Sequence, residues 1–308
     1  DVNRKAERAG GGLKNSLDLA EKSYRMSDEL HKSKYADAQR ALDTLAGAGH
    51  QAMLAGGCVR DRLLNIAPKD FDIATNAMPE RVMEVFAAAG LKVVPTGIDH
   101  GTITLVSRTG PIEITTLRKD VVPDGRRAKV SFTNATFAMD AERRDFTINA
   151  MFEDRSGKVH DFFGGQEDLQ RRRLRFVGEP EKRIQEDYLR IMRYFRFWAR
   201  LEFDSDAAAL DAIRKNSDGL KQISQERITS ELLETLSYGF VALPLEWMFK
   251  TGVMAIVPPE AKVGGAVSIL RTQDLDAIPN PFRALCRIAS FFDGERTSSD
   301  SMHALGKR

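Results

Sequence analysis

The stretch LAGGCVRDRLLNIAPKDFDIATNA, residues 54–77, decides how this chain folds. Near its end, Asp70 and Asp72 alternate with the apolar residues Phe71 and Ile73. Because successive side chains of a β-strand point to opposite faces, a strand here places both carboxylates on one face and both apolar groups on the other. Two carboxylates held together repel each other, and a hard cation such as Mg²⁺ relieves that repulsion. A solvent-facing strand edge is the alternative that this pattern leaves open.

Two glycines, Gly56 and Gly57, come before this strand and directly before an expected helix. Backbone N–H groups at such a turn can approach phosphate oxygens closely, and Arg60, about one turn into the helix, can add a forked donor. A tight turn between a strand and a helix would use the same two glycines. The combination of glycine turn, arginine and paired aspartates therefore points to a phosphorylated ligand more strongly than the glycines do alone.

Strand patterns and helix patterns alternate in the first half of the chain and give way to helices after about Gly165. This order predicts an α+β chain, with a small sheet domain followed by a helical domain. Strands are expected within residues 51–57, 71–75, 91–97, 101–107 and 112–118, and helices within residues 35–49, 59–64, 79–90 and 180–201. Residues 1–34 are polar and are expected to form a peripheral arm.

The composition excludes several classes of protein. The chain has 308 residues, 42% of them apolar and 29% charged, which is typical of a soluble protein with about two domains. Its two cysteines, Cys58 and Cys286, lie far apart, so we expect neither a disulfide framework nor a zinc site, and a reducing, cytoplasmic compartment fits. No apolar run reaches membrane-spanning length. Basic residues exceed acidic ones in residues 171–200, which favours a polyanionic partner such as a nucleotide or RNA.

Glu113 and the helix expected within residues 180–201 add two further candidates for the site. Glu113 alternates with apolar neighbours on another expected strand, so it could be a third metal ligand or simply a surface glutamate. On the helix, Asp187 and Arg190 are three residues apart and would stand one above the other. An acceptor beside a donor matches the pairing edges of cytosine and adenine, whereas an ordinary surface ion pair of about 0.2–0.5 kcal/mol is the alternative.

Four segments occur in an order that resembles one family: GGCVRD, KDFDIATNA, ERRDFTINAMF and RIQEDYLRIMRYFRF. They look like the signature segments of the class II tRNA nucleotidyltransferases, which include the CCA-adding enzymes and their bacterial poly(A) polymerase relatives. The resemblance runs from Ala38 to Leu236. It implies a nucleotidyltransferase-type mixed-sheet head domain at residues 35–163 and an all-helical neck at residues 164–238. A helical body and tail that binds tRNA would follow at residues 239–308, and this last segment carries little of the family pattern and is expected to be incomplete.

The resemblance also implies a reaction and a cofactor. Asp70 and Asp72 would bind Mg²⁺, with Glu113 as the third carboxylate. The 3′-hydroxyl of tRNA would then attack the α-phosphate of CTP or ATP and release pyrophosphate. Gly56, Gly57 and Arg60 would hold the triphosphate.

The segment RRDFTINA and the helix that follows it would contact the rest of the nucleotide. Arg144 would face phosphate, Asp145 would accept a hydrogen bond from the ribose 2′-hydroxyl, and Asn149 would support the loop. A charged helix cap is the alternative for this segment. Asp187 and Arg190 would select CTP and ATP without a nucleic-acid template, and Arg193 and Arg196 would add contacts to base or phosphate. Residues 224–236 would brace the template helix, with Ser224 or Gln225 as a cap and Glu226 and Arg227 orienting its arginines.

Two features bear on which member of the family this is. PTGIDHGTITLV, residues 95–106, resembles the CCA-adding type rather than the poly(A) polymerases. The loop at residues 117–142 has full length, and in this family that loop lets the pocket change from CTP to ATP. An enzyme that adds only CC is therefore disfavoured, and an A-adding enzyme remains an alternative. A non-enzymatic RNA-binding module would not need Asp70 and Asp72 together.

Overall fold

The computed structural model describes residues 29–121 and 129–256, and Cys286 and most of the expected body and tail lie outside these ranges. The chain divides into two compact units. The first contains the described residues up to Arg144 together with Ile148–Leu169, and the second contains Asp145–Thr147 and the described residues from Gln170 onward. Within the described ranges, no helix is both long and apolar enough to cross a membrane.

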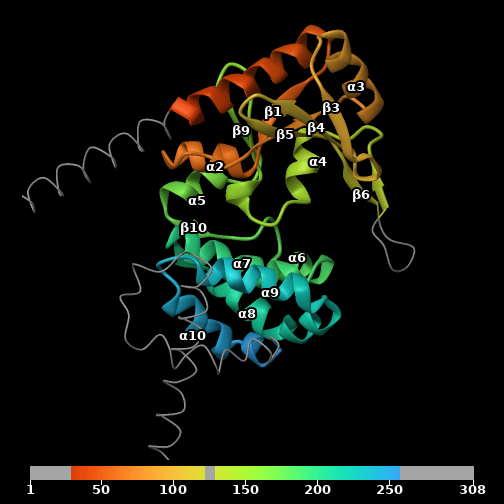
Figure 1. Ribbon diagram of the computed structural model, residues 1–308. Helices are drawn as coiled ribbons and strands as arrows, with labels where there is room; N and C mark the ends of the chain where they lie inside the picture. The colour runs from red at the N-terminus through yellow and green to blue at the C-terminus, as the bar shows by residue number, and fades with distance from the viewer. Residues whose placement is uncertain (1–28, 122–128, 257–308) are drawn as a thin grey trace, which may run out of the picture. The chain divides into compact units, whose positions relative to one another are not determined.

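A mixed seven-stranded sheet forms the centre of the first unit (Figure 1). Its strands are β1 (Ala52–Ala55), β2 (Phe71–Thr75), β3 (Val93–Gly97), β4 (Thr102–Ser107), β5 (Gly110–Thr116), β8 (Met151–Glu153) and β9 (Val159–Asp161), in the order β3-β4-β5-β2-β1-β8-β9. β2 and β5 are parallel, while β1 pairs antiparallel with both β2 and β8. The mixed sheet expected from the sequence is confirmed.

The helices of the first unit begin where the sequence supplies start signals. They are the helix of residues 29–47, α2 (Gly57–Leu63), α3 (Pro79–Ala88), α4 (Phe137–Glu142) and α5 (Gly165–Gln170), which ends at the unit boundary. Pro79 occupies the first turn of α3, where its missing N–H costs nothing, and the Thr136 side chain caps α4. Because the first helix already begins by residue 29, the expected arm is helical in its last residues. β6 (Lys119–Val121) pairs with β7 (Lys129–Ser131) around residues that the structure does not describe.

The second unit is mostly helical. It contains α6 (Pro180–Glu186), α7 (Leu189–Leu201), α8 (Ala207–Asn216), α9 (Gln225–Leu236) and α10 (Ala242–Lys250), with short 3-10 turns η3 (Ser217–Gln222) and η4 (Val253–Ala255). A small parallel pair, β10 (Arg173–Leu174) with β11 (Asp204–Ser205), corrects the expectation of an all-helical segment. α7 packs along α9 (Figure 1). Two aromatic residues of α7, Tyr194 and Phe197, form a cluster with Phe146 and Phe176.

The single helix predicted over residues 180–201 is wrong, because α6 ends at Glu186 and α7 begins at Leu189. Asp187 between them is extended, with φ −153° and ψ 104°. Its carboxylate accepts a hydrogen bond from the Leu189 N–H at 3.0 Å, and its carbonyl accepts one from the Arg190 N–H at 3.0 Å. An aspartate satisfies the free N–H groups at a helix start well, so Asp187 begins a new helix instead of continuing the old one.

Candidate functional site

Two carboxylates, those of Asp72 and Glu113, lie side by side on the sheet of the first unit, and Asp70 is close to them. Asp72 on β2 and Glu113 on β5 are register partners on neighbouring parallel strands, and Asp70 comes just before β2. All three side chains are exposed, whereas Ile73 and Ile112 are buried. The alternation expected from the sequence is therefore present, and the strand pairing adds Glu113 to the same face.

The charges around Asp72 disturb its ionisation. The pKa of Asp72 is raised from 3.8 to about 6, mainly because the surrounding protein desolvates the carboxylate; the negative charges of Glu113 and Asp70 add to this rise, and Arg144 opposes it. The side chain still keeps a solvent-facing surface, so water screens part of this effect. A nearby positive charge would stabilise the ionised form of this carboxylate and lower its pKa.

The residues of this face suit a hard divalent cation. Carboxylate oxygens are the donors that Mg²⁺ prefers, and proteins usually bind this ion through one or two carboxylates, completed by water and substrate oxygens. Across the described ranges, no group of three or more His, Cys, Asp or Glu side chains is arranged to hold a metal ion. Asp72 and Glu113, with Asp70 beside them, therefore offer donors rather than a closed metal cage.

Gly56 makes the turn that leads from β1 into α2. Its φ of 72° and ψ of −120° are unfavourable for any residue with a side chain. A Cβ at this position would also lie 2.5 Å from Arg144 Nη1 and 3.4 Å from the Asn149 carbonyl oxygen. Gly56 is thus required both for the backbone turn and for the close approach of Arg144. Gly57 is the first residue of α2.

The structure places Arg60 in the interior rather than at a phosphate-facing surface, since only 2% of the residue is exposed. Its Nη1 donates to the Asn149 side-chain oxygen at 2.5 Å, and its Nε donates to Asp61 at 2.8 Å. Arg60 therefore holds Asn149 in place. The backbone carbonyl of Asn149 in turn accepts a hydrogen bond from Arg144 Nη1 at 3.2 Å.

Arg144 is the arginine that lies near the carboxylates. Its Nη2 pairs with Asp140 at 3.0 Å, and its guanidinium lies 5.1 Å from the centre of the Phe152 ring. About a fifth of the side chain remains exposed. Asp140, which also pairs with Arg143 at 2.6 Å, was not among the residues predicted from the sequence. The spacing of Asp140 three and four residues before the two arginines was the available signal.

In the second unit, Asp145 is bound to an arginine of α7. Arg193 donates to Asp145 Oδ2 from Nε at 2.8 Å and from Nη2 at 2.5 Å. The other carboxylate oxygen accepts the Phe146 N–H at 2.8 Å. Arg193, expected from the resemblance to contact base or phosphate, therefore orients Asp145 in this structure.

The structure also places Arg196 in the interior, where α7 meets α9, instead of on a surface open to a nucleotide. Its Nε pairs with Glu231 at 2.6 Å and its Nη1 with Glu234 at 3.4 Å, and its guanidinium lies 4.4 Å from the centre of the Phe197 ring. Other residues of α9 were predicted from the sequence to brace this helix, and neither glutamate was among those named. Their spacing of three residues on an amphipathic helix was the signal for a shared face.

Asp187 and Arg190 do not stack on one helix, because the break between α6 and α7 separates them. Arg190 Nη1 donates to Glu186 at 2.6 Å and to the Arg183 carbonyl at 2.8 Å. Asp187 pairs at 3.4 Å with Arg227 of α9, a residue that the sequence analysis assigned to this brace. Ser224 takes the expected N-cap position of α9, without a hydrogen bond from its side chain. At the start of α7, Asp187 thus offers an acceptor and Arg190 a donor. Asp187 is paired with Arg227, and Arg190 is bonded to Glu186 and Arg183.

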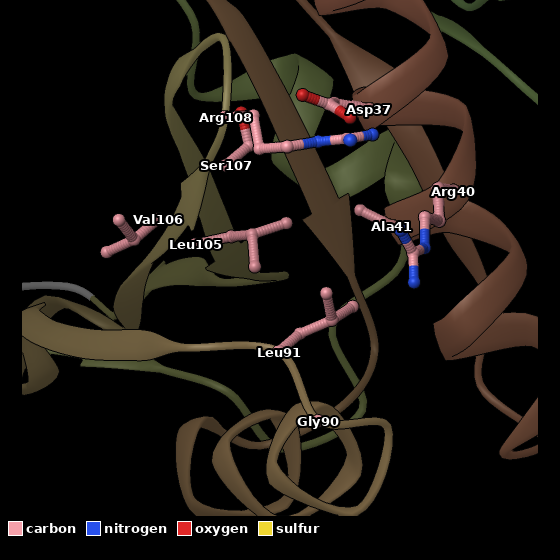
Figure 2. A pocket seen from close by; sticks show the side chains of 9 residues that line it. All are labelled: Asp37, Arg40, Ala41, Gly90, Leu91, Leu105, Val106, Ser107 and Arg108. Atoms are coloured by element: carbon pink, nitrogen blue, oxygen red, sulfur yellow. The ribbon is translucent and has the colours of Figure 1, made fainter.

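A cavity of about 350 Å³ lies elsewhere in the first unit, between the helix of residues 29–47 and β4 (Figure 2). Its lining residues are Asp37, Arg40, Ala41, Gly90, Leu91, Leu105, Val106, Ser107 and Arg108. None of the site residues expected from the sequence is among them. The carboxylate face is therefore distinct from this cavity.

Two family models match the chain. Residues 52–175 match the model described as "Poly A polymerase head domain". Residues 202–263 match the model described as "Probable RNA and SrmB- binding site of polymerase A". The first match contains the three carboxylates, Arg144 and Asp145, and ends before α6.

Curated relatives match about two thirds of the chain. The chain is 49% identical over 210 residues to the human protein "CCA tRNA nucleotidyltransferase 1, mitochondrial", which covers 67% of this chain and 48% of that protein. It is 44% identical over 201 residues to a "CCA-adding enzyme" of Streptococcus pyogenes, which covers 65% of this chain and 49% of that protein. The chain thus spans about half the length of the curated relatives it matches.

Solved structures show the same architecture. The CCA-adding enzyme of Bacillus stearothermophilus in complex with CTP has a TM-score of 0.67 and 38% identity, with 73% of this chain and 54% of that chain covered. A tRNA nucleotidyltransferase complexed with a primer tRNA and an incoming ATP analog has a TM-score of 0.63 at 24% identity, covering 79% of this chain and 72% of that chain. This second likeness concerns the fold alone.

Proposed function

We propose, from the premise that this chain belongs to the family of the CCA-adding tRNA nucleotidyltransferases and bacterial poly(A) polymerases, that it adds CCA to the 3′ end of tRNA. CTP and ATP are the substrates, and pyrophosphate is the leaving product. The observation that carries this proposal is the register pairing of Asp72 with Glu113 beside Asp70. Two neighbouring carboxylates on the sheet with a third close by suit metal-dependent phosphoryl transfer and have no evident role in a module that only binds RNA.

Asp70 and Asp72 are the residues that would hold Mg²⁺, with Glu113 as the neighbouring carboxylate. When bound, Mg²⁺ lowers the pKa of a coordinated hydroxyl and neutralises charge on the phosphates. The sheet holds the carboxylates in fixed positions, which is the main protein contribution to phosphoryl transfer. Asp72 must be deprotonated to act as a ligand, and the cation itself favours that state.

Arg144 is the residue we assign to the triphosphate, at the turn formed by Gly56 and Gly57. Its guanidinium lies against Gly56, and its positive charge lowers the pKa of Asp72. A phosphate bound at this turn would therefore meet a donor that is already in place. Arg60 and Asn149 act on the phosphate site only through Arg144. Arg60 holds the Asn149 side chain, and the Asn149 carbonyl accepts a hydrogen bond from Arg144. We therefore assign Arg60 a positioning role in place of direct phosphate contact.

Asp145 is the residue we assign to the ribose 2′-hydroxyl. A carboxylate accepts a hydrogen bond from this hydroxyl, and a deoxyribonucleotide cannot supply one. Arg193 fixes the orientation of Asp145 through both of its donors. Arg196 braces α7 through Glu231, and we assign it this structural role.

Asp187 and Arg190 are the residues we assign to the base. Asp187 accepts from the amino group of cytosine or adenine, and Arg190 donates to the ring nitrogen beside it. Guanine and uracil present the opposite polarity at these atoms. Both side chains keep some exposed surface, 38% for Asp187 and 13% for Arg190. The bond between Asp187 and Arg227 is long at 3.4 Å, so a base can compete for it.

One assay tests the function. The chain is incubated with Mg²⁺ and a tRNA that lacks its 3′ CCA, with CTP or ATP separately and together. CCA addition predicts two cytidines with CTP alone and one further adenosine when ATP is added. Addition of adenosine only to a tRNA ending in CC indicates an A-adding enzyme, and two cytidines without the adenosine indicate a CC-adding enzyme. Repeated adenosines indicate a poly(A) polymerase, and the absence of any extension on all primers overturns the enzyme proposal.

The same proposal includes the domain division and the compartment. We assign residues 35–163 to the catalytic head, residues 164–238 to base recognition and residues 239–308 to tRNA binding. We also assign the chain to the cytoplasm, because two distant cysteines suit a reducing compartment. The names of three animal relatives place those proteins in mitochondria. Fractionation of the source cells, with antibody detection of the chain, decides between the two compartments.

A further inference from the structure

The break between α6 and α7 is held in place by η3, a short turn that comes after α8. Just before the break, the Gln185 side chain donates to Asn216 at 3.1 Å, and Asn216 directly precedes η3. Just after the break, the Tyr188 ring lies against Gly219 in the middle of η3. The residues on either side of Asp187 thus contact the end of α8 and the turn η3 that directly follows it.

The contact between Tyr188 and Gly219 leaves no room for a side chain at position 219. A Cβ there would lie 2.1 Å from two carbons of the Tyr188 ring and 2.5 Å from a third. Gly219 and Leu220 of η3 are buried in the second unit, so the backbone of η3 has little room to retreat. Because the first ring atom of Tyr188 is among the three carbons, rotating the ring about its own axis cannot relieve the clash: the side chain must change its χ1 rotamer or move together with its backbone.

The Tyr188 backbone sets the direction of the proposed base-reading groups. Tyr188 is the N-cap of α7 and directly follows Asp187, and its carbonyl accepts a hydrogen bond from the Ile191 N–H at 3.1 Å. The Asp187 side chain is bonded to Leu189 in the first turn of α7, and the Arg190 side chain is bonded to Glu186 in the last turn of α6. A displacement of Tyr188 therefore moves Asp187 and Arg190 relative to each other.

We propose that Gly219 is a specificity-determining positioning residue. By making room for the Tyr188 ring, it sets the break between α6 and α7 and so the relative placement of Asp187 and Arg190. This inference rests on the proposed function, in which Asp187 and Arg190 read the base. The ring carries the effect and the hydroxyl does not, since within the described residues the Tyr188 hydroxyl makes no hydrogen bond.

The test compares Gly219→Ala with Gly239→Ala, a matched control in the same unit whose Cβ would meet nothing within 4 Å. The readout is the ratio of the dissociation constants for CTP and UTP, measured by equilibrium binding with Mg²⁺, together with misincorporation in the transfer assay. Gly219→Ala should lower the preference for CTP by about tenfold, the size expected when a charge-assisted hydrogen bond is misplaced. Gly239→Ala and Tyr188→Phe should keep the wild-type preference.

Further variants keep the inference falsifiable if Gly219→Ala does not fold. Tyr188→Ala creates no clash and should also lose the preference, and the double variant should behave as Tyr188→Ala alone does, because the two residues share one contact. The inference is overturned if a folded Gly219→Ala variant keeps the wild-type preference for CTP over UTP, or if Tyr188→Ala keeps that preference in full. It is also overturned if the effects of the two substitutions multiply in the double variant. A wild-type chain that binds CTP no better than UTP instead overturns the base-reading function.

Discussion

Arg193 donates two hydrogen bonds to one oxygen of Asp145, across 48 positions of the sequence. This ion pair joins the start of α7 to the short segment Asp145–Thr147, which belongs to the second unit although it interrupts the first in sequence. Together with the Phe146 N–H, which donates to the other oxygen, Arg193 orients the Asp145 carboxylate.

The first prediction concerns the sugar. Asp145→Asn keeps the shape of the side chain but weakens its bonds to Arg193 and its acceptance of a ribose hydroxyl. We expect the preference for ATP over dATP, measured as the ratio of transfer efficiencies, to fall by about tenfold or more. Unchanged preference in a folded Asp145→Asn variant would remove Asp145 from sugar selection. Glu142→Gln, three residues earlier in the chain, serves as the surface control.

The second prediction concerns pH and the carboxylate face. Because the folded state raises the Asp72 pKa from 3.8 to about 6, it binds a proton more tightly than the unfolded state does. In EDTA, the contribution of Asp72 to the free energy of unfolding should therefore fall as pH rises from about 4 to about 6 and then level off. Asp72→Asn should lack this fall and be more stable than wild type at pH 7 by about 1 kcal/mol, a value reduced for solvent screening.

Chemical denaturation across this pH range tests that prediction. A wild-type curve parallel to that of Asp72→Asn would contradict it. At pH 7, Mg²⁺ should raise the melting temperature of wild type more than that of Asp72→Asn, because binding to the folded state alone stabilises it. Asp72→Asn should also abolish nucleotide transfer.

The third prediction concerns the turn at Gly56. Gly56→Ala forces a side chain into a glycine-type backbone conformation and against Arg144, so we expect a loss of about 2–3 kcal/mol in the free energy of unfolding. Gly90→Ala shares the positive φ, at 68°, but its Cβ would meet nothing within 4 Å. It should cost only about 1 kcal/mol. Equal losses in the two variants would show that the approach of Arg144 to Gly56 has no energetic importance.

The fourth prediction concerns the two glutamates that bind Arg196. Glu231 is 13% exposed and bonds Arg196 Nε at 2.6 Å, whereas Glu234 is 51% exposed and lies 3.4 Å from Nη1. Removing the partner of a buried charge costs far more than removing an exposed one. Glu231→Gln should lower the free energy of unfolding by about 2–3 kcal/mol and Glu234→Gln by less than about 1 kcal/mol. The reverse order would contradict this account of the brace.

The fifth prediction concerns the base. Asp187→Ala removes the acceptor that we assign to the amino groups of cytosine and adenine. Nucleotide choice should loosen, so that UTP and GTP are used at rates closer to CTP and ATP, while some transfer survives. Competition assays with all four nucleotides measure this directly. A variant that keeps full selectivity would show that another group reads the base.

Much of the fold could be predicted because its signals are local. The alternation around Asp72 and Glu113 identified β2 and β5 and placed both carboxylates on one face of their strands, and Pro79 marked the start of α3. The same local reasoning failed at Asp187. Residues 180–201 read as one amphipathic helix, but the Asp187 carboxylate satisfies the N–H of Leu189 and starts a second helix. A side chain that competes with the backbone ladder is a choice that periodicity does not reveal.

Residue types and their spacing pointed to the candidates for the site: the carboxylates of KDFDIA, the glycine turn, the RRD segment and the arginines of α7. The folding of the chain set which groups each of these candidates contacts. It paired Glu113 with Asp72, buried Arg60 and Arg196 against Asn149 and Glu231, and directed Arg193 to Asp145. The physical reason is that a residue's type and spacing specify the bonds it can make. Which partner it finds depends on distant segments that only the folded chain brings together.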